Sequence, residues 1–122
     1  MATVVDIMKG GTSAGQARAI NGQVNGTVSA AGTAISDATD LLASINVVTT
    51  AAASSGVQLQ SGEIGDEVEI LNLGANAVTV YPDSTSNRIN QLSAGSGFTL
   101  PINTAVKLRK YTTARWIGYL SA

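Results

Sequence analysis

The pattern of apolar and polar positions in the chain changes its period near residue 46. Beyond that point, short stretches alternate residue by residue, as in "DEVEIL", where Val68 and Ile70 share one face and Glu67 and Glu69 share the other. Alternation of this kind, interrupted by Gly, Asn and Ser, is typical of short β-strands joined by turns. Further strands are expected in these segments: INVVTTA, VQLQ, AVTVY, GFTLPI, AVKLRKY and RWIGYLS.

The residues between these stretches indicate how the strands connect. Gly74 and Asn76 tolerate positive φ, so they predict a hairpin loop between "DEVEIL" and "AVTVY". Pro82 has no N–H to donate to a sheet, so it should end the second of these strands. Short strands with such turns predict a mostly-β domain, built as an antiparallel β-sandwich of the jelly-roll type.

The stretch that precedes the strands has a helical period. Its apolar positions are Ile35, Ala38, Leu41, Leu42 and Ile45. Thr33 is suited to cap the first turn, and Asp37 would interact favourably with the helix dipole, so one short helix is expected over residues 33–45. We therefore expect a domain of residues 33–122 that follows an extended N-terminal arm of residues 1–32.

The expected arm is rich in Gly, Ala, Ser and Thr and contains two Asn-Gly pairs, which favour turns. Ile20, Val24 and Val28 are its recurring apolar residues, and three such residues cannot build a core. The arm is then either a flexible leader or a segment that becomes ordered against a neighbouring subunit. In the second case these three residues are the anchors, and Arg18 would meet an acidic loop of the partner.

Composition lowers the expectation of an enzyme and favours self-association. The 122 residues suggest one domain, but only five are aromatic and only 12% are charged. A surface so poor in charge is often covered by another subunit, and we expect a homotrimer. The chain has no Cys and no His, which removes thiolate nucleophiles, the Ser-His-Asp triad and most transition-metal sites. Neither catalysis nor a cofactor or metal is expected.

Neither a signal peptide nor a membrane span is expected. Asp6 interrupts the first apolar run, and no stretch approaches the roughly 18 apolar residues that a membrane helix requires. The chain should therefore be made in a cytoplasm, without a membrane partner. A net charge of −1 gives no general basic field for nucleic acid.

Charged residues are sorted along the chain. The acids between residues 54 and 87 are Glu63, Asp66, Glu67, Glu69 and Asp83, and no base occurs there. The bases between residues 88 and 122 are Arg88, Lys107, Arg109, Lys110 and Arg115, and no acid occurs there. The two sets could pair across strands of one subunit. Alternatively, acidic strands of one subunit could face basic strands of the next in a closed ring.

Three groups of residues have a structural and a functional interpretation. Glu67 and Glu69 resemble a carboxylate pair of a glycosidase or a metal site, but two acids on one strand face are usually only solvated. The clustered aromatics are Tyr111, Trp116 and Tyr119, which suit packing or, alternatively, sugar binding. The basic patch is Lys107, Arg109 and Lys110, which suits contact with an acidic protein surface as well as it suits nucleic acid.

Several segments occur together in an order that resembles a known family. They read "INVVTTAAASSGVQL", "GDEVEILNLGANAVTVYP", "INQLSAGSGFTL" and "ARWIGYL", and they cover about residues 45–120. This order is similar to a small β-domain of tailed-bacteriophage virion proteins. Where that pattern has a compact Pro- or Gly-rich loop after "YP", this chain has "DSTSNR".

The resemblance implies a structural part of a virion. The expected function is that of a capsid decoration (cement) protein, which binds and stabilises the phage head. The alternative is a tail-fibre or receptor-binding module. The expected partners are other copies of the chain and the major capsid protein, and the expected location is the capsid surface.

Overall fold

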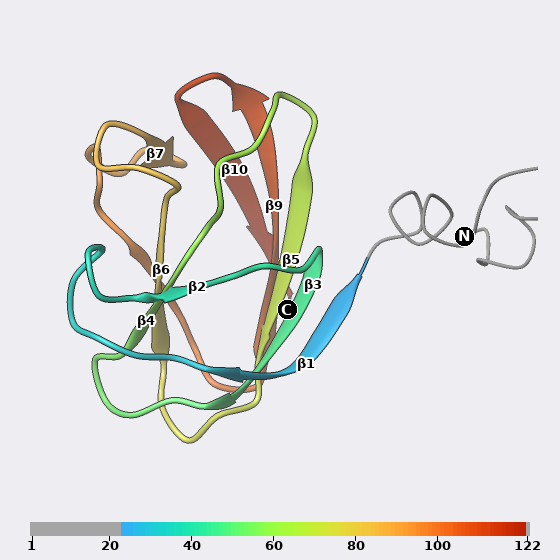
Figure 1. Cartoon of the computed structure of the whole chain (residues 1–122), viewed down its shortest axis with the longest axis vertical. Helices are drawn as coiled ribbons and strands as arrows, with labels where there is room; N and C mark the ends of the chain where they lie inside the picture. The colour runs from blue at the N-terminus through green and yellow to red at the C-terminus, as the bar shows by residue number, and fades with distance from the viewer. Residues whose placement is uncertain (1–22, 122) are drawn as a thin grey trace, which may run out of the picture.

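The structure, a computed structural model, describes residues 23–121. These residues form ten strands and no helix, so the prediction of a mostly-β chain is confirmed. The strands are β1 (Val24–Ser29), β2 (Thr39–Asp40), β3 (Ile45–Thr50), β4 (Gly56–Gln58), β5 (Glu67–Asn72), β6 (Val78–Tyr81), β7 (Arg88–Ile89), β8 (Phe98–Leu100), β9 (Thr104–Thr112) and β10 (Arg115–Leu120) (Figure 1).

The strands form two sheets that face each other, and the chain passes from one to the other along most of its length. The larger sheet has the order β1-β3-β5-β9-β10-β7, and the smaller has the order β2-β4-β6-β8. From β1 to β6, odd-numbered strands stack in parallel in one sheet and even-numbered strands stack in parallel in the other. This part of the chain is therefore a coil with solenoid-like stacking, visible as successive turns in Figure 1.

The expected antiparallel jelly roll is wrong, because both sheets are mixed and the first half of the chain stacks in parallel. The segment around Gly74 and Asn76 does not make a hairpin, because it leads from β5 in one sheet to β6 in the other. The Asn72 side chain holds the turn. Its Nδ2 donates to the backbone oxygens of Asn76 (2.9 Å) and Leu100 (3.1 Å), and its Oδ1 accepts from the backbone N–H of Gly74 (3.0 Å).

Among the named strands, each antiparallel pair includes a strand from the second half of the chain. There β9 lies between β5 and β10 and pairs antiparallel with both, while β8 pairs antiparallel with β6. β9 and β10 form the one hairpin, with a short turn at residues 113–114. The edge strand β7 then pairs in parallel with β10. The strands of the second half thus extend the two sheets that the parallel coil of the first half forms.

The expected helix over residues 33–45 is also wrong. Residues 33–38 form a turn that leads into β2, and the carboxylate of Asp37 accepts hydrogen bonds from the backbone N–H groups of Thr33 (3.1 Å) and Ala34 (2.9 Å). A short Asp side chain that bonds nearby backbone in this way competes with helix formation. Gly32 enters the turn with φ of 75°, and a Cβ there would collide with the Asp37 carboxylate.

The domain begins before residue 33, which corrects the expected boundary of the arm. Residues 24–29 form β1, which pairs with β3, and Ala30 donates its backbone N–H to Thr50 O at 2.9 Å. Val28 is 4% exposed and belongs to the core. It is therefore not an anchor for a partner. Arg18 and Ile20, the other residues named for that role besides Val24, lie outside the described residues.

The core lies between the two sheets and is mainly aliphatic. The alternation of apolar residues in the sequence correctly predicts its centre on both sheets, because Ile70, Val106 and Leu108 face Val78 and Val80, all at most 1% exposed. Trp116 of β10, 1% exposed, is the largest side chain of the core. No helix of the described chain has the length and apolar character to cross a membrane.

Candidate functional site

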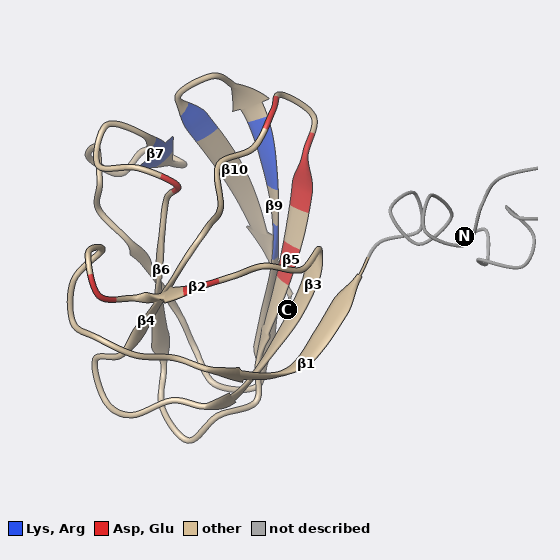
Figure 2. Ribbon diagram, viewed as in Figure 1, with Lys and Arg blue, Asp and Glu red and all other residues tan. Residues whose placement is uncertain are grey.

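The outer face of the larger sheet carries acids on β5 beside bases on β9 (Figure 2). In the sheet register, Glu67 lies opposite Arg109 and Glu69 lies opposite Lys107. The Glu67 carboxylate contacts the guanidinium of Arg109 and lies 3.1 Å from Nζ of Lys107. The charges therefore pair across strands of one subunit. Because both basic side chains are more than half exposed, each pair contributes only about 0–1 kcal/mol to stability.

Lys110 is not part of this face, which corrects its place in the expected basic patch. Inward and outward positions alternate along β9, so Lys110 follows Val106 and Leu108 toward the interior and is 5% exposed. Its Nζ donates to the backbone oxygen of Gly62 at 2.9 Å and to Oδ2 of Asp83 at 2.8 Å. Adjacent residues of a strand point to opposite faces, so Arg109 and Lys110 cannot form one patch.

Asp83 is the centre of a buried polar cluster. In addition to the bond from Lys110, its Oδ1 accepts hydrogen bonds from Nδ2 of Asn87 (2.7 Å) and from the indole N–H of Trp116 (3.0 Å). Nζ of Lys110 lies 5.7 Å from the centre of the Trp116 ring, within the range of a cation–π interaction. Burial alone would raise the pKa of Asp83, but the hydrogen bonds from Lys110, Asn87 and Trp116 outweigh it and hold the pKa below its ordinary value.

This cluster is structural in its chemistry. Three donors engage the Asp83 carboxylate and hold its pKa low, so it stays charged and is a weak base toward a substrate proton. It fastens the "DSTSNR" loop after β6 to the inner faces of β9 and β10. Sequence reasoning missed the cluster, although one signal was present: Lys110 stands at an inward position of a strand, where a lysine requires an acidic partner.

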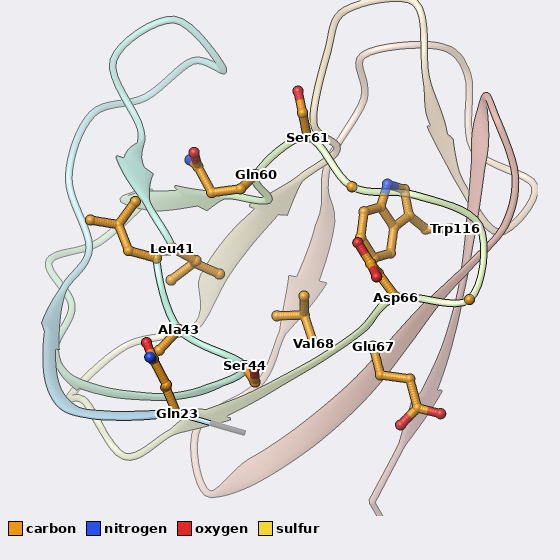
Figure 3. A pocket seen from close by; sticks show the side chains of 13 residues that line it. Gln23, Leu41, Ala43, Ser44, Gln60, Ser61, Asp66, Glu67, Val68 and Trp116 are labelled. Atoms are coloured by element: carbon orange, nitrogen blue, oxygen red, sulfur yellow. The ribbon is translucent and has the colours of Figure 1, made fainter. Parts of the chain in front are cut away.

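A hollow opens between the two sheets beside the connections from β2 to β3 and from β4 to β5 (Figure 3). Its volume is about 430 Å³, and Leu41, Val68 and Trp116 line it with apolar surface. The carboxylate of Asp66 is engaged by the backbone N–H of Glu63 at 2.8 Å. Glu67 also lines the hollow, but its carboxylate is turned away in Figure 3 and binds β9. The lining thus offers no free acid–base pair, and residues 23–121 hold no metal-binding group of three His, Cys, Asp or Glu.

Large apolar side chains are exposed at both ends of the larger sheet. Leu73, Ile102 and Leu120 are 57%, 46% and 55% exposed. Backbone hydrogen bonds place them at one end of β5, β9 and β10, because Asn103 N–H donates to Asn72 O and Ser121 N–H donates to Ala105 O, both at 2.7 Å. We call these three residues the apolar end.

The opposite end of the sheet has three further exposed apolar residues. They are Val24, Leu42 and Ile64, at 66%, 76% and 61% exposed. Val24 begins β1, and the other two lie in the loops before β3 and β5, which run parallel to β1. Of the two expected anchors that the structure describes, Val28 is buried and Val24 lies on the surface.

Comparison with known proteins adds no family to this description. No family model, no curated protein and no solved structure matches the chain.

Proposed function

We propose that the chain is a structural protein of a tailed-bacteriophage virion, and that it decorates and stabilises the capsid as a homotrimer. The observation that carries the proposal is the apolar end. Leu73, Ile102 and Leu120 remain exposed on a domain whose core is already filled by other residues. Exposed apolar side chains that gather in one place favour contact with another protein.

The chemistry of the other surfaces supports an assembly role. The acids of β5 are matched by bases of β9 in the same chain, and the buried cluster of Asp83 holds a loop in place. Both features fix the shape of the surface without supplying reactive groups. The sequence resemblance to virion β-domains covers about residues 45–120, which are the strands from β3 to β10.

Association through the apolar end would join subunits, and a second surface must then hold the trimer on the capsid. We assign this second contact to the chain before β1, together with the exposed Val24 at the start of β1. β1 is an edge strand of the larger sheet, so its free side can accept another extended segment. Three weak contacts from one trimer would act together and raise occupancy by avidity.

A tail-fibre or receptor-binding module is the second candidate. It is favoured by one observation, a surface hollow beside Arg88, Arg115 and Tyr111 on the edge of the larger sheet. A module that meets a host surface needs such a site, whereas a protein that only reinforces a shell does not.

Capsid decoration can be tested with a truncated chain. Deletion of residues 1–22 leaves every strand that the structure describes intact, so the shortened protein should fold. The intact chain should bind capsids stripped of accessory proteins up to a fixed occupancy, and the truncated chain should bind to a lower one. Occupancy is measured by sedimenting the particles and quantifying both proteins on a gel.

Two outcomes of this experiment contradict parts of the account. If the intact chain does not bind capsids, the decoration function is wrong. If the intact and truncated chains bind equally, decoration stands, and attachment belongs to other surfaces, with the loop of residues 83–88 the next one to test.

A further inference from the structure

Two arginines lie side by side at the edge of the larger sheet. β7 and β10 pair in parallel, and Arg88 is opposite Arg115. Residues opposite each other on neighbouring strands point to the same face of a sheet. The residues that follow them, Ile89 and Trp116, are buried in the core. Arg88 and Arg115 therefore share the outer face.

The charge of this pair is not compensated within the described residues. The other bases of residues 23–121 each contact a carboxylate, and they are Lys107, Arg109 and Lys110. Over the same residues, neither Arg88 nor Arg115 has an acid within 4.0 Å of its guanidinium nitrogens. Like charges opposite each other on neighbouring strands destabilise a sheet, so an anion bound between the two guanidinium groups would relieve this repulsion.

A hollow of about 430 Å³ accompanies the two arginines. Its lining consists of Ser86, Arg88, Tyr111, Thr112, Ala114 and Arg115. The register of β9 and β10 skips Tyr111, because Arg115 lies opposite Thr112 whereas Trp116 lies opposite Lys110. An extra residue of this kind is a β-bulge, and bulges redirect side chains at functional sites. The Tyr111 side chain is 44% exposed at the wall of the hollow.

We propose that this hollow binds an acidic saccharide. The two guanidinium groups would hold a single carboxylate or phosphate, for which their planar array of donors is well matched. The Tyr111 ring offers an apolar surface to a sugar ring, and the hydroxyls of Ser86 and Thr112 offer partners to sugar hydroxyls. A concave site of this volume suits a small ring better than it suits a protein surface.

This proposal does not rest on capsid decoration, because it concerns the hollow that favours the second candidate, a module that meets a host surface. The test is a titration of the ¹⁵N-labelled full chain with glucuronic acid and with glucose 1-phosphate, followed by NMR. We expect saturable shifts of the amides at residues 86–88 and 111–115. Glucose should cause much smaller shifts, because it lacks the anionic group.

Substitution of the arginines should remove the binding. The variant with Arg88→Gln and Arg115→Gln should bind both acidic sugars about tenfold more weakly or worse, because each charge-assisted hydrogen bond contributes strongly. The matched control is Lys107→Gln with Arg109→Gln, which removes the same charge from the same face and should bind as the wild type does. The dispersion of the amide spectrum verifies that each variant is folded.

Several outcomes would overturn the proposal. One is the absence of shifts around the hollow with either acidic sugar. Another is binding of inorganic phosphate as tight as that of glucose 1-phosphate, which would reduce the site to a general attraction for anions. A third is tighter binding of a glutamate-rich peptide than of either sugar, which would assign the arginines to a protein contact.

Discussion

At the scale of single residues, the Asp83–Lys110 pair distinguishes this domain from a purely apolar β-fold. Both side chains are almost fully buried, at 3% and 6% exposed. A buried pair is costly to form, but the removal of one partner is costlier still, because the other charge then remains in the interior without compensation. The pair therefore holds the loop after β6 against the core. Its loss should lower the free energy of unfolding of the whole domain.

Asp83→Asn should lower the free energy of unfolding by about 3 kcal/mol or more at pH 7. The amide keeps the size of the carboxylate but leaves Lys110 without a counter-charge. Urea unfolding followed by Trp116 fluorescence measures the change. Asp40→Asn is the control, because Asp40 is exposed at β2 and its loss should change stability little. Equal stability of the two variants would show that the cluster is not important for folding.

The same pair predicts a dependence of stability on pH. Since folding lowers the pKa of Asp83 from its ordinary value of 3.8, the folded state binds fewer protons there than the unfolded chain does. The stabilisation is complete above the ordinary value and is lost as pH falls through the lowered pKa. The difference in unfolding free energy between wild type and Asp83→Asn should thus shrink as pH drops below about 4. A difference that stays constant down to pH 2 would contradict this assignment.

Residue alternation allowed much of the core to be predicted from sequence, but not the role of single charged residues. Val78, Val80, Val106 and Leu108 lie inside as expected. Lys110 was grouped with its exposed neighbours because it is close to them in sequence, although alternation places it on the inner face. Asp83 and Lys110 are 27 residues apart, and only the fold brings them together.

At the scale of elements, the existence of strands was predictable but their partners were not. The alternation of apolar and polar residues is the same for a strand in a parallel sheet and for one in an antiparallel sheet. The pattern therefore could not distinguish a coil from a jelly roll. The turn at Gly74 and Asn76 has hairpin residues, yet it joins two sheets because the Asn72 side chain bonds across it. The expected helix failed because Asp37 stabilises a turn in its place.

The pairing of β5 with β9 makes a prediction about charge reversal. Glu67→Lys with Glu69→Lys places bases opposite Lys107 and Arg109, and should lower the free energy of unfolding by about 1 kcal/mol. The oligomeric state should not change, because these pairs lie within one subunit. Thermal unfolding and sedimentation equilibrium measure the two properties.

A compensating variant controls for this effect. Adding Lys107→Glu and Arg109→Glu to the two substitutions restores opposite charges across the strands and should recover most of the stability. Dissociation of the oligomer by the first variant alone would instead place the acids and bases at an interface between subunits.

At the scale of the whole molecule, the apolar end predicts how subunits associate. Leu73→Ser, Ile102→Ser and Leu120→Ser together should convert the proposed homotrimer to monomers while the domain stays folded, because none of the three belongs to the core. The control is Val24→Ser, Leu42→Ser and Ile64→Ser, which removes a similar apolar area from the opposite end. Sedimentation velocity at micromolar concentration compares the two. A wild-type monomer under these conditions, or dissociation by the control alone, would contradict the assignment.

The central claim, that this fold serves a virion by reinforcing its capsid, is tested most directly by copy number. In purified virions of any phage whose genome encodes this chain, its amount can be measured against the major capsid protein by quantitative mass spectrometry. The account predicts a fixed ratio of the same order as the number of capsid subunits. A few copies per particle would assign the chain to the tail instead, and its absence from purified virions would contradict a structural role altogether.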